Sequence, residues 1–144
     1  MISCTEFIPA YSELFKYIEE KDGKEGVLEY WDYISDVYVK DRLGRIVSEK
    51  GILGCWEYWE KALNEEAADF TMELNEEAGA FEINMRYCPS KGRLLELEHI
   101  EPYNDYCGHC DVVYRRVLEP LGYESELDMS EVDKAACVFK LVKR

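Results

Sequence analysis

The fold is decided by a stretch in the middle of the chain that reads DFTMELNEEAGAFEINMRY, residues 69–87. Apolar and polar residues alternate on both sides of a turn over residues 75–79. The apolar positions are Phe70, Met72 and Leu74 before the turn, and Phe81, Ile83, Met85 and Tyr87 after it. A period of two residues is that of a strand with one buried face. The stretch therefore predicts a β-hairpin with one face in water.

A second hairpin is predicted over residues 122–142. Leu127 and Met129 continue an alternation that begins at Tyr123, and Cys137, Phe139 and Leu141 return on one face after a turn. The two hairpins are separated by residues at helical spacing, which are Cys107, Cys110, Val113, Tyr114, Val117 and Leu118. We predict a helix from about residue 104 to 119 that starts at Asn104 or Asp105, since both side chains can cap a helix.

The first 66 residues show helical periodicity throughout. Asp22-Gly23 and Gly51 interrupt the pattern, and a short third helix is expected around Leu43 to Val47. A further short helix is expected around Leu94 to Leu97. The sequence thus predicts an α+β fold in which N-terminal helices pack on a four-stranded antiparallel sheet made of two β-hairpins joined by a helix. We expect a single domain over residues 1–144, with helices in 1–66 and the sheet and Cys-rich helix in 67–144.

Composition excludes several classes of partner. The chain has 144 residues, with 31 acidic and 17 basic side chains and a net charge of −14. Nucleic acids and anionic membrane surfaces are bound through lysine and arginine, so we expect neither as a partner. The opening residues contain no basic region followed by an apolar run, so we expect a cytoplasmic protein without a targeting segment. The six cysteines are then expected to be free thiols.

Residues 106–111 read YCGHCD and concentrate one histidine and two cysteines. Three interpretations remain open. Cys107 and Cys110 can be small buried residues on the apolar side of the helix. They can instead be reactive, because a helix N-terminus and the neighbouring His109 favour the thiolate. Finally, a C-x10-H-x7-C-x2-C pattern can bind zinc through Cys88, His99, Cys107 and Cys110.

Two further features accompany this segment. Asp105 lies one helical turn before His109 and can orient the ring and favour its charged form. Residues 86–93 contain three basic side chains and no acidic one, in an otherwise acidic chain. Arg86 and Arg93 flank Cys88 there and can bind a small carboxylate by charge-assisted hydrogen bonds.

The second half of the chain resembles the L-2-amino-thiazoline-4-carboxylic acid hydrolase-like family. The resemblance covers roughly residues 80–142. It is carried by Cys88-Pro89 after a strand, residues 106–111, Leu121-Gly122-Tyr123 and a final strand with Cys137-x-Phe139. The family's last cysteine usually follows a Gly-Asp turn, whereas residues 131–136 here contain no glycine. A more distant resemblance is to small ligand-binding α+β domains of the vinyl-reductase type.

The family resemblance implies a hydrolase that opens a cyclic C–N or C–S bond in a small substrate carrying a carboxylate. Such chemistry needs a nucleophile, a proton donor and a cation for the carboxylate. We assign the catalytic roles to Cys107, His109, Cys110 and Asp111, and substrate binding to Cys88, Arg86 and Arg93. We expect no cofactor and no bound metal. The alternative is a non-catalytic module that binds a small ligand or zinc, which the missing Gly-Asp turn favours. The sequence does not define the substrate or the oligomeric state.

Overall fold

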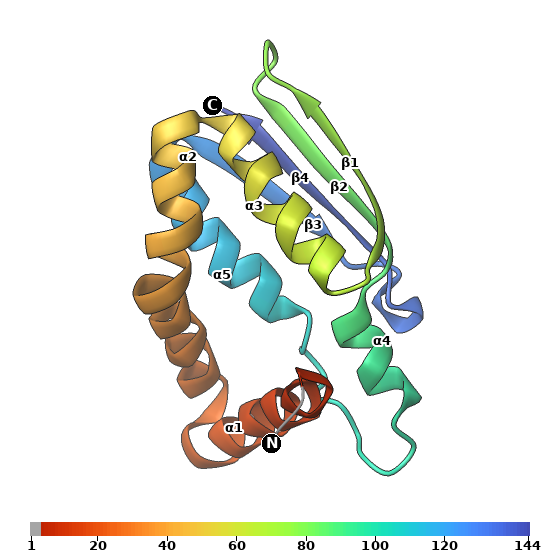
Figure 1. Cartoon of the computed structure of the whole chain (residues 1–144). Coiled ribbons are helices and arrows are strands. Elements are labelled where there is room, and N and C mark those ends of the chain that lie inside the picture. Colours follow the sequence, from red (N-terminus) through yellow and green to blue (C-terminus); the bar gives the residue numbers. More distant parts are fainter. Residues whose placement is uncertain (1–3) are drawn as a thin grey trace.

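A computed structural model describes residues 4–144 and begins with a long, bent helical rod (Figure 1). Helix α1 (Cys4–Ile34) bends at Gly23, whose φ of 73° is a left-handed value that suits glycine. The break predicted at Asp22-Gly23 is therefore a kink. The second half of α1 continues through a π-helix, η1 (Ser35–Gly44), into α2 (Arg45–Lys50). The short third helix predicted from the sequence is thus continuous with the second. None of the helices within residues 4–144 is long and apolar enough to cross a membrane.

The rod turns back at Gly51, and α3 (Ile52–Glu65) packs closely against α2. The contact depends on Gly54, because a Cβ atom at this position would lie 2.6 Å from the carbonyl oxygen of Ile46. Real Cβ atoms do not approach backbone that closely, so only glycine allows the two helices to meet here.

The four strands form one antiparallel sheet, as the sequence predicts. They are β1 (Asp69–Asn75), β2 (Ala80–Tyr87), β3 (Tyr123–Asp128) and β4 (Cys137–Lys143), in the order β1-β2-β4-β3. Each predicted hairpin forms, and β2 joins β4 with Ile83 opposite Phe139. The predicted α+β class and the four-stranded sheet are confirmed.

The sheet has one buried face. Phe81, Ile83 and Leu141 point into the core, while alternate residues such as Asn84 and Lys140 are exposed. Helices α3 and α5 (Gly108–Leu118) lie over the buried face in Figure 1. Trp59 of α3 stacks on Phe81 with ring centroids 5.7 Å apart. Apolar residues of the N-terminal helices and of the sheet thereby share one core.

Two boundaries differ from the prediction. Helix α4 (Pro89–Glu96) begins directly after Cys88, because proline is suited to the first turn of a helix. Helix α5 begins at Gly108, later than predicted, after turns over residues 104–107. No side chain caps α5, so the predicted capping role of Asn104 or Asp105 is wrong. Short 3-10 helices, η2 (Glu119–Leu121) and η3 (Val132–Lys134), complete the chain.

Candidate functional site

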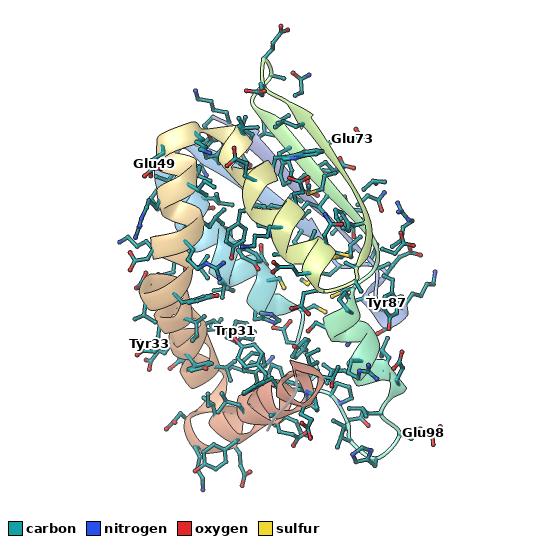
Figure 2. All side chains as sticks on the ribbon, in the orientation of Figure 1. Trp31, Tyr33, Glu49, Glu73, Tyr87 and Glu98 are labelled. Atoms are coloured by element: carbon teal, nitrogen blue, oxygen red, sulfur yellow. The ribbon has the colours of Figure 1, made fainter. Side chains whose placement is uncertain are left out.

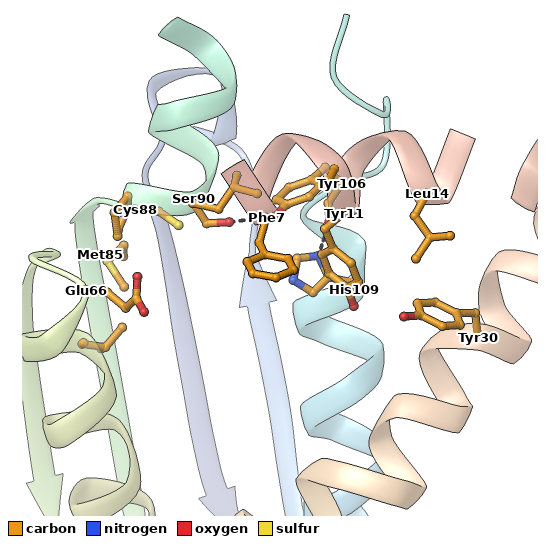
Figure 3. A pocket seen from close by; sticks show the side chains of 14 residues that line it. Phe7, Tyr11, Leu14, Tyr30, Glu66, Met85, Cys88, Ser90, Tyr106 and His109 are labelled. Carbon is orange, nitrogen blue, oxygen red and sulfur yellow. Dashed lines mark hydrogen bonds between the residues drawn. The ribbon is translucent and has the colours of Figure 1, made fainter. Parts of the chain in front are cut away.

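A cavity of about 600 Å³ lies between the N-terminal helix, the end of β2 and the start of α5. Its walls come from both halves of α1, the end of α3, the end of β2, the start of α4 and the turn that leads into α5. This volume is in the range of small-molecule sites. The lining is mostly apolar and aromatic (Figure 3) and consists of Phe7, Ile8, Ala10, Tyr11, Leu14, Tyr30, Leu63, Glu66, Met85, Cys88, Pro89, Ser90, Tyr106 and His109.

His109 is held on the cavity wall by its own helix turn and by aromatic rings. Its Nδ1–H donates a hydrogen bond to the carbonyl oxygen of Tyr106, which leaves Nε2 as the acceptor. The Cys110 Sγ lies 3.4 Å from this Nε2. The rings of Tyr11 and Tyr106 pack edge-on against the imidazole, at centroid distances of 5.5 and 4.9 Å. A thiol, a base and a group that orients the base are thus in contact.

Burial decides the charge of His109. It lowers the pKa of the imidazole, against the opposing effects of the Tyr106 carbonyl and the Asp105 carboxylate. Asp105 raises the pKa, as expected from the sequence, but its effect is smaller than that of burial. The ring is oriented by Tyr106, whereas the sequence assigned that role to Asp105. His109 is therefore a neutral base in the folded protein at neutral pH.

Four cysteines, Cys88, Cys107, Cys110 and Cys137, form what we call the thiol cluster. Cys107 and Cys110 lie on one turn, with the Cys110 N–H donating to the Cys107 carbonyl oxygen at 3.1 Å. Cys137 of β4 lies opposite Met85 of β2, and the Cys88 N–H donates to Ala135 at 2.7 Å. Figure 2 shows sulfur atoms gathered between α5 and the junction of β2 with α4. All four thiols are free.

The thiol cluster is protonated at neutral pH. Burial, followed by repulsion between neighbouring thiolates or carboxylates, raises the pKa of Cys107, Cys110 and Cys137 to about 12. One of the three interpretations of the sequence, a reactive thiol favoured by a helix N-terminus and a nearby imidazole, implied the opposite direction. That expectation is wrong because the thiols are buried and His109 is uncharged.

Cys88 differs from the other three thiols. Burial raises its pKa as well, but the backbone amides of Lys91 and Ser90 at the start of α4 oppose that shift. The Lys91 cation, on a side chain that is itself buried, opposes it further. Cys88 is also the one member of the thiol cluster among the described residues that line the cavity.

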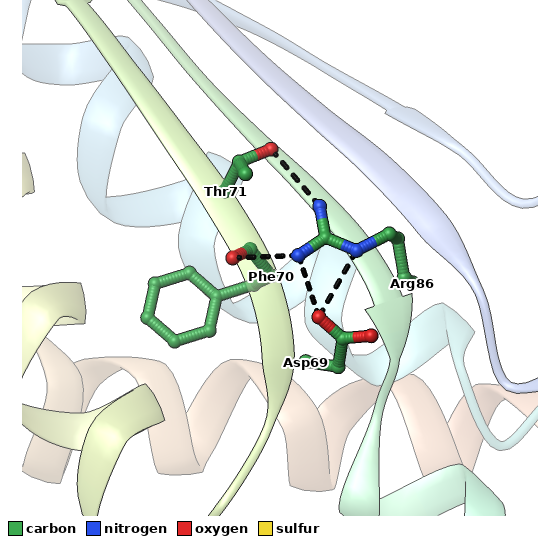
Figure 4. Close-up of polar contacts among 4 residues, drawn as sticks. All are labelled: Asp69, Phe70, Thr71 and Arg86. Carbon is green, nitrogen blue, oxygen red and sulfur yellow. Dashed lines mark hydrogen bonds and ion pairs between the residues drawn. The ribbon is translucent and has the colours of Figure 1, made fainter.

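The two arginines assigned to substrate binding lie outside the cavity. Arg86 is on the exposed face of the sheet, where its Nε and one terminal nitrogen donate to Asp69 at 3.0 and 2.5 Å (Figure 4). It also donates to the Phe70 carbonyl at 3.1 Å. Arg93 donates to Glu96 at 3.1 Å on α4. The structure does not bring either guanidinium to Cys88's side of the cavity, because each is held by an acidic neighbour on the surface.

Asp111 and His99 are also away from the cavity. Asp111 forms an ion pair with Arg115, one turn later, at 2.9 Å. His99 is exposed in the segment between α4 and α5. Within residues 4–144, no group of three or more His, Cys, Asp or Glu side chains is arranged to hold a metal ion. The zinc pattern through Cys88, His99, Cys107 and Cys110 is therefore not assembled in this part of the chain.

Several cavity residues were not predicted to be functional. Tyr11 and Tyr30 belong to the helical pattern, which indicates only that one face is buried, and Phe7 lies outside that pattern. Glu66 follows the end of α3 and carries no motif. An excess of aromatic residues on the buried face of the first helices was the available signal. It became meaningful only in the folded chain, where Tyr11 of α1 packs against Tyr106 and His109 around the start of α5.

Comparison of the chain with known protein families, with curated proteins and with solved structures found no match.

Proposed function

We propose that this chain is a small-molecule hydrolase that opens a cyclic C–N or C–S bond, as the resemblance to the L-2-amino-thiazoline-4-carboxylic acid hydrolase-like family implies. One observation carries the proposal, namely the 3.4 Å contact between Cys110 Sγ and the Nε2 of His109, a residue that lines a substrate-sized cavity. The base is oriented by the Tyr106 carbonyl, as a catalytic base requires. A cytoplasmic location belongs to the proposal, because a reducing compartment keeps the thiols available.

Cys110 and His109 together can open the ring, with the thiol as nucleophile and the imidazole as the group that moves the proton. The Cys110 thiol transfers its proton to His109 Nε2, and its sulfur bonds to the electrophilic ring carbon. The ring C–S or C–N bond then breaks, and the leaving atom takes the proton from His109. Water adds to the same carbon, the bond to Cys110 breaks, and the thiol recovers its proton. In the alternative route, His109 takes the proton from a water molecule that attacks directly.

Turnover of two related compounds tests the proposal. The full chain is incubated separately with 2-aminothiazoline and with 2-aminothiazoline-4-carboxylate. Ring-opened product is measured by mass spectrometry. We expect His109→Gln to reduce turnover by about 100-fold or more, since it removes the base. Cys110→Ser should do the same if the thiol is the nucleophile, and only Cys110 should then carry a covalent adduct. Cys55→Ser is the control, because Cys55 is a buried free thiol outside the thiol cluster and the cavity lining. Absence of turnover with both compounds would reject the hydrolase.

A second candidate is a non-catalytic module that binds a small ligand. The observation that favours it is the raised pKa of all four thiols in the thiol cluster, which leaves no resting thiolate. The same experiment separates the two functions. Binding that persists in Cys110→Ser without turnover in the natural chain would identify the module.

A further inference from the structure

The cavity has an unusual balance of charge. Among the described residues that line it there is one carboxylate, Glu66, and there is neither lysine nor arginine. The other titratable groups of the lining are neutral at pH 7. Burial lowers the pKa of His109 and raises the pKa of Tyr11, Tyr30, Tyr106 and Cys88. The described lining thus presents a single negative group and no positive one.

Glu66 is available to a ligand. None of the ion pairs found in residues 4–144 involves its side chain. Figure 3 shows the Glu66 carboxylate on one side of the cavity, with Phe7, Tyr11 and His109 on the other. A ligand between them would meet a carboxylate at one end and aromatic rings at the other.

The aromatic side of the cavity suits a cation. Tyr11 lies edge-on to both Tyr30 and Tyr106, at centroid distances of 6.4 and 6.3 Å, so the rings are set at different angles. The faces of aromatic rings attract positive charge, most strongly when water is excluded. A flat cation whose charge is delocalised is only weakly hydrated and stacks on such rings. The net charge of −14 adds an attractive field for cations over the whole molecule.

A carboxylate finds no lysine or arginine side chain in the described lining. The exposed Arg86 and Arg93 are held by Asp69 and Glu96, respectively. Lys91 does not belong to the lining. An anion entering the cavity would lose its hydration without gaining a counter-charge from the described lining, and Glu66 would repel it.

We propose that the cavity binds a small organic cation with a flat, delocalised head group, such as an amidinium or isothiouronium, and without a carboxylate. Glu66 pairs with the head group and the rings of Phe7, Tyr11 and Tyr30 contact its faces. The inference depends on the proposed function only in that both use this cavity.

Three probes of the same shape test the charge preference. Benzamidine is a cation, benzamide is neutral and benzoate is an anion, and their binding to the full chain is measured by calorimetry at neutral pH. We expect benzamidine to bind about tenfold more tightly than benzamide, and benzoate to bind least. Glu66→Gln should remove the preference of benzamidine over benzamide. Glu65→Gln is the matched control, because this neighbouring carboxylate does not line the cavity.

A second variant tests the aromatic contribution. Phe7 is 60% exposed, so Phe7→Leu should fold normally while removing one ring from the cavity. We expect it to weaken benzamidine more than benzamide, by roughly threefold. The inference is overturned if benzamidine does not bind at millimolar concentration, if benzoate binds as well as benzamidine, or if Glu66→Gln leaves the preference intact.

The outcomes for the two proposals are separable. A cation preference that depends on Glu66, without turnover of either thiazoline, supports this inference and rejects the hydrolase. Turnover of a thiazoline without a cation preference supports the hydrolase and rejects this inference.

Discussion

At the scale of single residues, His109 links the stability of the fold to pH. Its pKa in the folded protein is lowered by burial, whereas the unfolded chain has the ordinary value of about 6.5. Below that pH the unfolded state binds a proton that the folded state resists. This contribution to stability is therefore complete above about pH 6.5 and is lost as the pH falls toward the lower folded pKa.

Unfolding by urea at a series of pH values measures this effect. We expect the free energy of unfolding to fall as the pH drops below about 6.5, with a contribution from His109 of up to about 1.4 kcal/mol per pH unit. His109→Gln should remove this part of the slope. His99→Gln should retain it, because His99 is exposed. An unchanged slope in His109→Gln would show that the imidazole is protonated equally in both states.

Cys88 should be the most reactive member of the thiol cluster. The amides at the start of α4 and the Lys91 cation stabilise its thiolate, and its side chain lines the cavity. We expect iodoacetamide to modify Cys88 before Cys107, Cys110 and Cys137, as measured by peptide mass spectrometry over time. Lys91→Met should slow the reaction, whereas Lys134→Met should not, since Lys134 is exposed and paired with Glu131. Earlier modification of Cys107 or Cys110 would contradict the assignment.

Some site residues are accessible to sequence reasoning and others are not. The spacing of Cys107, His109 and Cys110 places them together correctly, because neighbours on one helix turn are fixed by local geometry. The protonation of these groups could not be inferred, since burial depends on what the rest of the chain packs against them. That Glu66 lines the cavity could not be inferred either, because its position there depends on tertiary structure alone.

At the scale of the elements, the α2–α3 contact depends on the absence of a side chain at Gly54. We expect Gly54→Ala to destabilise the protein by about 1–3 kcal/mol in urea unfolding, because the new Cβ would meet backbone. Gly44→Ala is the comparison, and we expect a smaller loss of stability. Its Cβ would lie 3.2 Å from a Val117 methyl group, which can move more easily. Equal effects of the two substitutions would show that the helices adjust their separation freely.

The periodicity of apolar residues predicted which helices and strands form more accurately than it predicted where they begin and end. Both hairpins were predicted from alternation, because only one face of this sheet is buried. The start of α4 at Pro89 was missed, since residues 89–93 show no apolar periodicity and the helix there is set by Pro89 and by its packing against α1. The π-helical stretch η1 was also missed, and there Val39 and Leu43 are buried whereas Val37 and Tyr38 are exposed.

At the scale of the whole molecule, the shared core predicts cooperative unfolding. Trp59 of α3 packs against Phe81 and Phe139 of the sheet, and Ser35 of η1 donates to the Val113 carbonyl of α5 at 2.9 Å. We expect the helix signal in circular dichroism and the sheet signal in infrared spectra to be lost at one urea concentration. Trp59→Ala should lower the urea midpoints of both signals together. The corresponding loss of unfolding free energy should be about 3–5 kcal/mol. Separate transitions would divide the chain into two folding units.

The cavity is walled by segments from distant parts of the chain, and this has a kinetic consequence. Tyr11 and His109 pack against each other in its wall, although almost the whole helical rod and the first hairpin lie between them in the sequence. Contacts that close such long loops tend to form late in folding, after local helices and hairpins. A bound ligand would then stabilise the native state but not the transition state. It should prolong the lifetime of the folded protein while leaving the rate of refolding unchanged.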